Sequence, residues 1–187
     1  MDDQTKTTTN EEGSVQTKTK IKKLIAYTDG SYDKKTKKCS LGVVFINPET
    51  GAPFEYLKTS IDEIGYCNMR NVGGEIKAAE KAMTYAIDNH YDEIEIHYDY
   101  KGVEDWPTEK WKTNNEYTAK YVEFYKDASE KIAIQFVHVK AHSHDTFNDM
   151  ADALAKGALG LFSKNSTNLM AMISDFLNSG TKNSSEK

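Results

Sequence analysis

The sequence predicts a single α/β domain, built on a five-stranded mixed sheet with helices on both faces. Three observations support this fold class. Short apolar runs typical of strands come first, strand and helix patterns then alternate, and 187 residues with 38% hydrophobic content suffice for one core. An antiparallel meander followed by alternating strands and helices predicts a mixed sheet whose ligands bind at strand ends.

Three strands open the domain. They are the runs LIAYTD, LGVVFI and PFEYLKTSI, and the turn NPETG separates the last two. In the first run Ile25, Tyr27 and Asp29 share a face, so we expect Asp29 to end an otherwise apolar strand face. Gly30 and Ser31 then predict a tight turn that lets a ligand approach the backbone.

Helices and strands alternate after this meander. We expect a helix from about residue 74 to 89, where apolar residues recur at helical spacing. The run IEIHYD at 94–99 predicts a fourth strand, and a Trp-rich helical region follows from 100 to about 130. The run IAIQFVHV at 132–139 predicts the fifth strand, and the last core helix is expected to start near Thr146.

The two ends of the chain differ from the domain, which we place at residues 21–160. Residues 1–20 have almost nothing to bury, so we expect a disordered tail or linker. Residues 161–187 predict a short amphipathic helix followed by a frayed end. We expect this helix to pack on the domain rather than to bind a partner.

Composition limits the class of protein. The mean hydropathy is -0.70, and no apolar run approaches the roughly 20 residues of a membrane-spanning helix. The N-terminus lacks the apolar core of a signal peptide, so we expect an intracellular, cytoplasmic protein. Cys39 and Cys67 fit neither a disulfide framework nor a zinc site and are expected to be free thiols. A net charge of -5 argues mildly against a nucleic-acid partner.

Four carboxylates lie where a charge is costly to bury. Asp29 and Asp99 end strands, Glu75 lies beside the Ala-rich face of its helix, and Asp152 lies on an apolar helix face. Each one alone could be a turn residue, a helix cap or a first-turn acid. Together they would repel unless a divalent cation lay among them, and oxygen-only ligands favour Mg²⁺ or Mn²⁺ over zinc. Such a site predicts phosphoryl chemistry, and the metal would offset part of the acidity.

The stretches YTDGS, GEIKAAEKAM, YDYKGVEDW and VKAHSHDTFNDMADALA resemble type 1 ribonuclease H, in the stand-alone cellular form that lacks a long basic handle. The resemblance runs in order from about Lys22 to Leu159. It implies a ribonuclease H-like fold and an endonuclease that hydrolyses the RNA strand of RNA–DNA hybrids, leaving 3′-hydroxyl and 5′-phosphate ends. It also implies two Mg²⁺ ions, for which Mn²⁺ can substitute, and it assigns their ligands as Asp29, Glu75, Asp99 and Asp152.

The resemblance assigns further roles. His142 matches the family's loop histidine, which moves protons or assists product release, better than the adjacent His144 does. Substrate contacts are implied for six residues, namely Gly30, Ser31, Asn71, Gly73, Gly74 and Asn148. Val72 and Gly73 replace polar residues of the family's best-known members. Trp106 and Trp111, with the lysines near them, could bind the DNA strand. Alternatively, both tryptophans belong to the core and the lysines are solvated.

Other functions fit the same residues. One is a non-catalytic nucleic-acid-binding scaffold of this fold, and another is a two-metal nuclease of the wider superfamily that acts on DNA. A third is an acidic interaction domain with solvated carboxylates. Without a basic handle, affinity for a hybrid is expected to depend on a tail or on a separate hybrid-binding module. We expect a monomer that does not associate with membranes.

Overall fold

The computed structural model describes residues 20–140, 145–161, 168–169 and 171–175. The strands are β1 (Lys23–Asp33), β2 (Lys38–Ile46), β3 (Pro53–Ile61), β4 (Glu93–Tyr98) and β5 (Ala133–His138). The helices are α1 (Ile64–Asn68), α2 (Asn71–Asp88), α3 (Gly102–Asp105), α4 (Glu116–Ser129) and α5 (Thr146–Ala158). None of the described helices combines the length and apolar character that crossing a bilayer requires.

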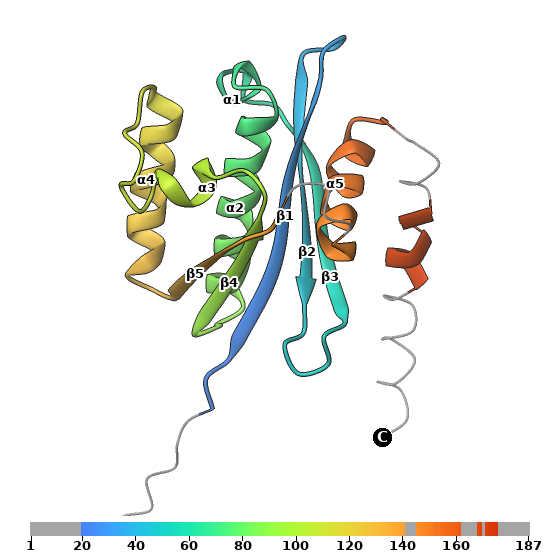
Figure 1. Cartoon of the computed structure of the whole chain (residues 1–187), viewed down its shortest axis with the longest axis vertical. Coiled ribbons are helices and arrows are strands. Elements are labelled where there is room, and N and C mark those ends of the chain that lie inside the picture. The colour runs from blue at the N-terminus through green and yellow to red at the C-terminus, as the bar shows by residue number, and fades with distance from the viewer. Residues whose placement is uncertain (1–19, 141–144, 162–167, 170, 176–187) are drawn as a thin grey trace, which may run out of the picture.

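The strands form one mixed sheet in the order β3-β2-β1-β4-β5. The β1–β2 and β2–β3 pairs are antiparallel, whereas β1–β4 and β4–β5 are parallel. Helix α2 packs on one face of the sheet and α5 on the other, with α4 outside α2 (Figure 1). The predicted five-stranded mixed sheet with helices on both faces is therefore confirmed.

Alternating residues of the strands enter two apolar clusters. On the α2 face, Leu24 and Ile96 of the strands pack with Ile76 and Met83 of α2. On the other face, the members are Val44, Ile46, Met150, Ala151, Leu154 and Ile173. Because successive side chains of a strand point to opposite faces, each helix layer has its own part of the core.

The end of the first strand was predicted wrongly. Strand β1 continues past Asp29 to Asp33, and Gly30 and Ser31 pair with Leu41 and Ser40 of β2 rather than forming a turn. Gly30 instead marks a close approach of a helix, because a Cβ atom there would lie 2.3 Å from the backbone nitrogen of Glu75. A glycine at such a contact has the same sequence signature as a turn glycine.

The helical boundaries also differ in places. Helix α2 begins three residues earlier than expected, at Asn71, and the short α1 before it was not predicted. The single helical region expected from 100 to about 130 is two helices, α3 and α4. The side chain of Asn115 caps α4 by accepting hydrogen bonds from Tyr117 N and Thr118 N, which fixes a new helix start after the loop.

The assignment of the cysteines as free thiols was wrong. Cys39 of β2 and Cys67 of α1 form a disulfide, with their Cα atoms 5.0 Å apart. The pairing arises because β3 returns antiparallel to β2, so α1, which follows β3, lies beside the start of β2. Two isolated cysteines 28 residues apart carry no local pattern that reveals this proximity.

Several predictions fall outside the described residues. They include the tail before Lys20, His142 and His144 in the 141–144 segment, and most of the C-terminal extension. In the described part of that extension, residues 171–175 are helical and Ile173 is buried in the second cluster.

Candidate active site

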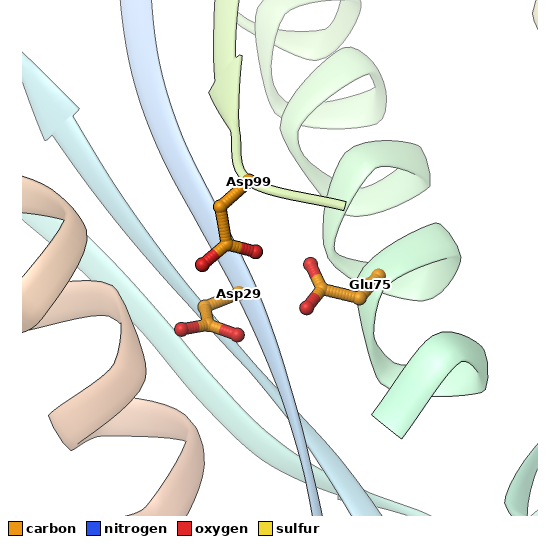
Figure 2. A group of neighbouring side chains, drawn as sticks. All are labelled: Asp29, Glu75 and Asp99. Carbon is orange, nitrogen blue, oxygen red and sulfur yellow. The ribbon is translucent and has the colours of Figure 1, made fainter. Parts of the chain in front are cut away.

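The cluster of carboxylates lies where β1 and β4 stop pairing with each other. Their parallel ladder ends at Tyr27 and His97, and Asp29 and Asp99 each follow two residues later, Asp29 within β1 and Asp99 directly after β4. Glu75, from the first turns of α2, points into the space between them (Figure 2). One carboxylate oxygen from each of the three residues lies within 4.8 Å of the others.

Two glycines let both helix layers reach this point. A Cβ atom on Gly30 would collide with the backbone of α2 at Glu75. A Cβ atom on Gly42, which pairs with Asp29 across the β1–β2 ladder, would lie 2.1 Å from the carbonyl oxygen of Ala151 in α5. The absence of side chains at these positions therefore brings the acids of α2 and α5 towards Asp29.

The fourth predicted acid lines the cleft into which the other three carboxylates open. Asp152 lines it from α5, and the Nζ atom of Lys156, one helical turn later, donates to Asp152 Oδ2 at 2.6 Å. Asp152 is outside the group of three whose oxygens lie within 4.8 Å. Its charge nevertheless acts on the cluster, because it is among the causes of the raised pKa of Asp29.

Burial and mutual repulsion raise the pKa values of the two inner acids. Burial, followed by the charges of Asp152 and Asp99, raises the pKa of Asp29 to about 8, although Gly30 N donates to Asp29 Oδ1 at 2.6 Å. Burial, followed by the charges of Asp29 and Asp99, raises the pKa of Glu75 well above its usual value. The cluster therefore holds protons at neutral pH unless a cation replaces them.

Two buried oxygens without hydrogen-bond partners indicate what kind of cation fits this site. Among the described residues, Glu75 Oε2 and Asn148 Oδ1 are buried side-chain atoms without a hydrogen-bond partner. The amide of Asn148 lies beside Asp99, with Nδ2 at 3.5 Å from Asp99 Oδ2. Buried acceptors without donors are costly, and a hard divalent cation satisfies carboxylate and amide oxygens together. The residues present therefore fit a Mg²⁺ or Mn²⁺ site.

The carboxylates open into a cleft of about 730 Å³. Of the predicted substrate contacts, Gly30, Ser31, Asn71 and Asn148 line it. Gly73 and Gly74 are buried in the first turn of α2, where Cβ atoms would meet Tyr66 O at 2.0 Å and Ser40 O at 2.2 Å. Their contact with substrate stays a prediction, as does the role of His142.

The sequence analysis missed part of the lining. The additional residues are Tyr32, Lys34, Arg70, Tyr100, Asp149 and Lys156. Arg70, directly before α2, has a φ of 62°, a backbone conformation that is uncommon outside glycine. The run of lysines after Asp33 was the available signal for Lys34.

Comparisons with known proteins bear on this site. A family model described as RNase H matches residues 21–159. Two curated relatives, both named Ribonuclease H and found in Wolbachia sp. subsp. Drosophila simulans (strain wRi) and Wolbachia pipientis wMel, are each 37% identical over 57 residues. That alignment covers 29% of this chain and only 39% of each relative.

Solved structures share the fold. RNase H1 from the halophilic archaeon Halobacterium salinarum NRC-1 superposes with a TM-score of 0.63 at 24% identity, over 74% of this chain and 98% of that one. LC11-RNase H1, solved in complex with RNA/DNA hybrid, superposes with a TM-score of 0.58 at 17% identity, over 73% of this chain and 99% of that one.

Proposed function

The chain belongs to the RNase H family, and on this basis we propose that it is an endonuclease that hydrolyses the RNA strand of RNA–DNA hybrids. The observation that carries the proposal is the convergence of three acids, from β1, α2 and the end of β4, within 4.8 Å at the floor of a cleft. The solved complex of LC11-RNase H1 with RNA/DNA hybrid supports the choice of substrate.

The metal ligands in this proposal are Asp29, Glu75, Asp99 and Asp152, which would hold two Mg²⁺ ions or their Mn²⁺ equivalents. When bound, such ions would lower the pKa of an attacking water and stabilise charge on the leaving oxygen. In this proposal the water attacks phosphorus and the bond to O3′ breaks, which would leave 3′-hydroxyl and 5′-phosphate ends. Within the protein, Lys156 orients the carboxylate of Asp152. Asn148 turns its amide nitrogen Nδ2 towards Asp99 Oδ2, and its carbonyl oxygen Oδ1 has no hydrogen-bond partner.

The remaining residues would position the substrate. Ser31 and Asn71 line the cleft close to the acids and can hydrogen-bond ribose 2′-hydroxyls, the groups that distinguish RNA from DNA. His142, outside the described residues, is proposed to transfer a proton or assist product release. The His142→Ala variant should then turn over more slowly while binding metal normally.

Labelled substrates test the proposal directly. The protein is incubated with an RNA–DNA hybrid, duplex DNA and duplex RNA, each with and without Mg²⁺. We expect cleavage of the RNA strand of the hybrid only, and only with metal. The Asp29→Asn variant should reduce cleavage to background because Asp29 lies at the centre of the cluster, whereas Asp127→Asn, at an exposed position on α4, should cleave at the parent rate.

Each alternative function gives a different result in this assay. Metal-dependent cleavage of duplex DNA would indicate a DNA nuclease of the same superfamily. Binding of the hybrid without cleavage by the parent protein would indicate a scaffold. An acidic interaction domain would show neither, and Mg²⁺ would leave its melting temperature unchanged.

A further inference from the structure

We propose that the tip of the β1–β2 hairpin, residues 34–38, binds the phosphate backbone of the nucleic acid where it extends beyond the catalytic carboxylates. The inference rests on the proposed function for the identity of the polyanion. The cationic surface would supply the phosphate contacts that we expected from a tail or a separate module, and it lies within the domain.

The hairpin tip concentrates positive charge in a chain whose net charge is -5. Four of its five residues are lysines and all are exposed, namely Lys34, Lys35, Lys37 and Lys38. Among the residues that the structure describes, no ion pair joins any of these four side chains to a carboxylate. Their charge is therefore available to a ligand.

The adjacent acid does not cancel this charge. Asp33 accepts hydrogen bonds from Thr36 Oγ1 at 2.7 Å and from Lys35 N at 3.0 Å, and these bonds lower its pKa. Its carboxylate is thereby held within the turn, where it shapes the backbone. One aspartate against four lysines leaves a strongly cationic tip.

The tip is continuous with the catalytic cleft. Strand β1 carries Asp29 and leads directly into the hairpin, which rises above the helices on both sides (Figure 1). Lys34 lines the same cleft as Asp29 and Arg70. Lys34 follows Asp29 by five positions, which is about 16 Å of extended chain at roughly 3.3 Å per residue. That length is close to five nucleotides at about 3.4 Å per nucleotide.

The hairpin presents these lysines on an ordered backbone. Asp33 pairs with Lys38 across the ladder, and Lys37 N donates to Asp33 O at 2.8 Å. Lys37 itself has a left-handed backbone, with a φ of 56°. One residue after the tip, the disulfide from Cys39 joins β2 to α1. A preformed backbone reduces the entropy lost when phosphates bind.

Phosphate binding predicts a measurable dependence on salt. Each lysine that neutralises a phosphate releases condensed counterions, so affinity falls as salt rises, with a log–log slope of about −0.9 per contact on a duplex. Two to four such contacts would contribute about 2–4 to the slope. Lysine suits this role because its ammonium group acts as a point charge and needs no fixed geometry.

The test compares two variants with equal loss of charge. The tip variant carries Lys34→Gln, Lys35→Gln, Lys37→Asn and Lys38→Gln, with asparagine at position 37 because it tolerates a left-handed backbone. The control variant carries glutamine at four exposed lysines on or after α2 and α4, namely Lys81, Lys120, Lys126 and Lys131. Both are made in the Asp29→Asn background, and binding of a labelled RNA–DNA hybrid is followed by fluorescence anisotropy between 50 and 200 mM salt, a range of roughly fourfold.

The tip variant should bind about 10- to 100-fold more weakly at about 100 mM salt, with a salt slope smaller by about 2–4. The control variant should stay within about threefold of its parent. Replacing all four tip lysines by arginine should preserve both affinity and slope. Equal weakening in the tip and control variants, or an unchanged slope in the tip variant, would overturn the proposal.

Thermal melts of each variant show whether it folds. If the full tip variant does not fold, the double variant Lys35→Gln/Lys38→Gln replaces it and should give about half the change in salt slope. Binding and cleavage separate this inference from the proposed function. A parent protein that binds the hybrid through the tip but never cleaves it would refute only the nuclease. A parent protein that cleaves the hybrid, with a tip variant that binds the hybrid as tightly as the control variant does, would refute only the present inference.

Discussion

Asp29 is a carboxylate placed where its ionisation opposes folding. It is 7% exposed, and its raised pKa of about 8 compares with 3.8 for the unperturbed group. In the metal-free protein its proton therefore stabilises the native state. That contribution is fully present below about pH 4 and is lost as the pH rises towards 8, because the unfolded chain releases the proton first.

The Asp29→Asn variant should accordingly stabilise the metal-free protein. At pH 8 we expect its free energy of unfolding to exceed that of the parent by about 1–3 kcal/mol, and near pH 4 the two should be equal. Denaturant unfolding in the presence of a chelator measures both values. The exposed Asp127→Asn variant serves as the control, and a difference of the same size at both pH values would contradict the assigned pKa.

Helix α5 begins with a cap that also places a site residue. The side chain of Asp145 accepts hydrogen bonds from Phe147 N at 3.0 Å and Asn148 N at 3.1 Å. Helix α4 begins with an equivalent cap, in which Asn115 accepts from Tyr117 N and Thr118 N, both at 2.9 Å. The two caps are matched in geometry, but only α5 carries Asn148 and Asp152.

Removing either cap should cost a similar amount of stability and have different effects on activity. We expect Asp145→Ala and Asn115→Ala each to lower the free energy of unfolding by about 0.5–2 kcal/mol. Only Asp145→Ala should also lower the rate of hybrid cleavage, because it releases the backbone of Asn148. Equal cleavage rates in both variants, measured below their melting temperatures, would show that the α5 cap has no part in the site.

The disulfide joins the start of β2, next to the hairpin tip, to α1 before α2. A cross-link that closes a 28-residue separation stabilises a fold by roughly 3–4 kcal/mol when the native geometry is unstrained. We expect protein purified without reductant to show no titratable thiol after denaturation, and added reductant to lower its free energy of unfolding by about 2–4 kcal/mol. The Cys39→Ala/Cys67→Ala variant should not respond to reductant. Two reactive thiols per chain in the untreated protein would exclude the bond.

The molecule as a whole has two core layers, and the second one includes residues from beyond α5. Ile173 is 3% exposed and packs in the cluster with Val44, Ile46 and Leu154, whereas the adjacent Met172 is 42% exposed. This part of the C-terminal extension therefore covers the same sheet face as α5. It packs on the domain, as its amphipathic pattern predicted.

Truncating these two neighbouring side chains should have very different effects. Ile173→Ala removes a buried side chain from the second cluster, and we expect the free energy of unfolding to fall by about 2–4 kcal/mol. Met172→Ala should change it by less than about 0.5 kcal/mol. Chemical denaturation of both variants gives the comparison. Similar values for the two would mean that Ile173 does not contribute to the core.

Much of the fold could be predicted from the sequence because it depends on local patterns. Short apolar runs and alternation identified the five strands, and helical spacing identified α2 and α5. The cost of burying charge singled out Asp29, Glu75, Asp99 and Asp152 before any contact was known. Each of these inferences uses residues within a few positions of one another, and such patterns survive in the folded chain when the local preference agrees with the global one.

Only the tertiary structure decided which of these residues meet and how closely. Gly30 looks the same in sequence whether it forms a turn or admits the backbone of α2, and the Cys39–Cys67 bond depends on the return of β3 along β2. The same holds for Lys34 of the hairpin tip, which lines the cleft with Asp29 only because β1 continues four residues beyond Asp29. The sequence by itself determined the elements and the chemical character of the site. The register of the sheet and the close packing of two helix layers determined its geometry, because contacts between distant residues depend on steric fit that no local pattern encodes.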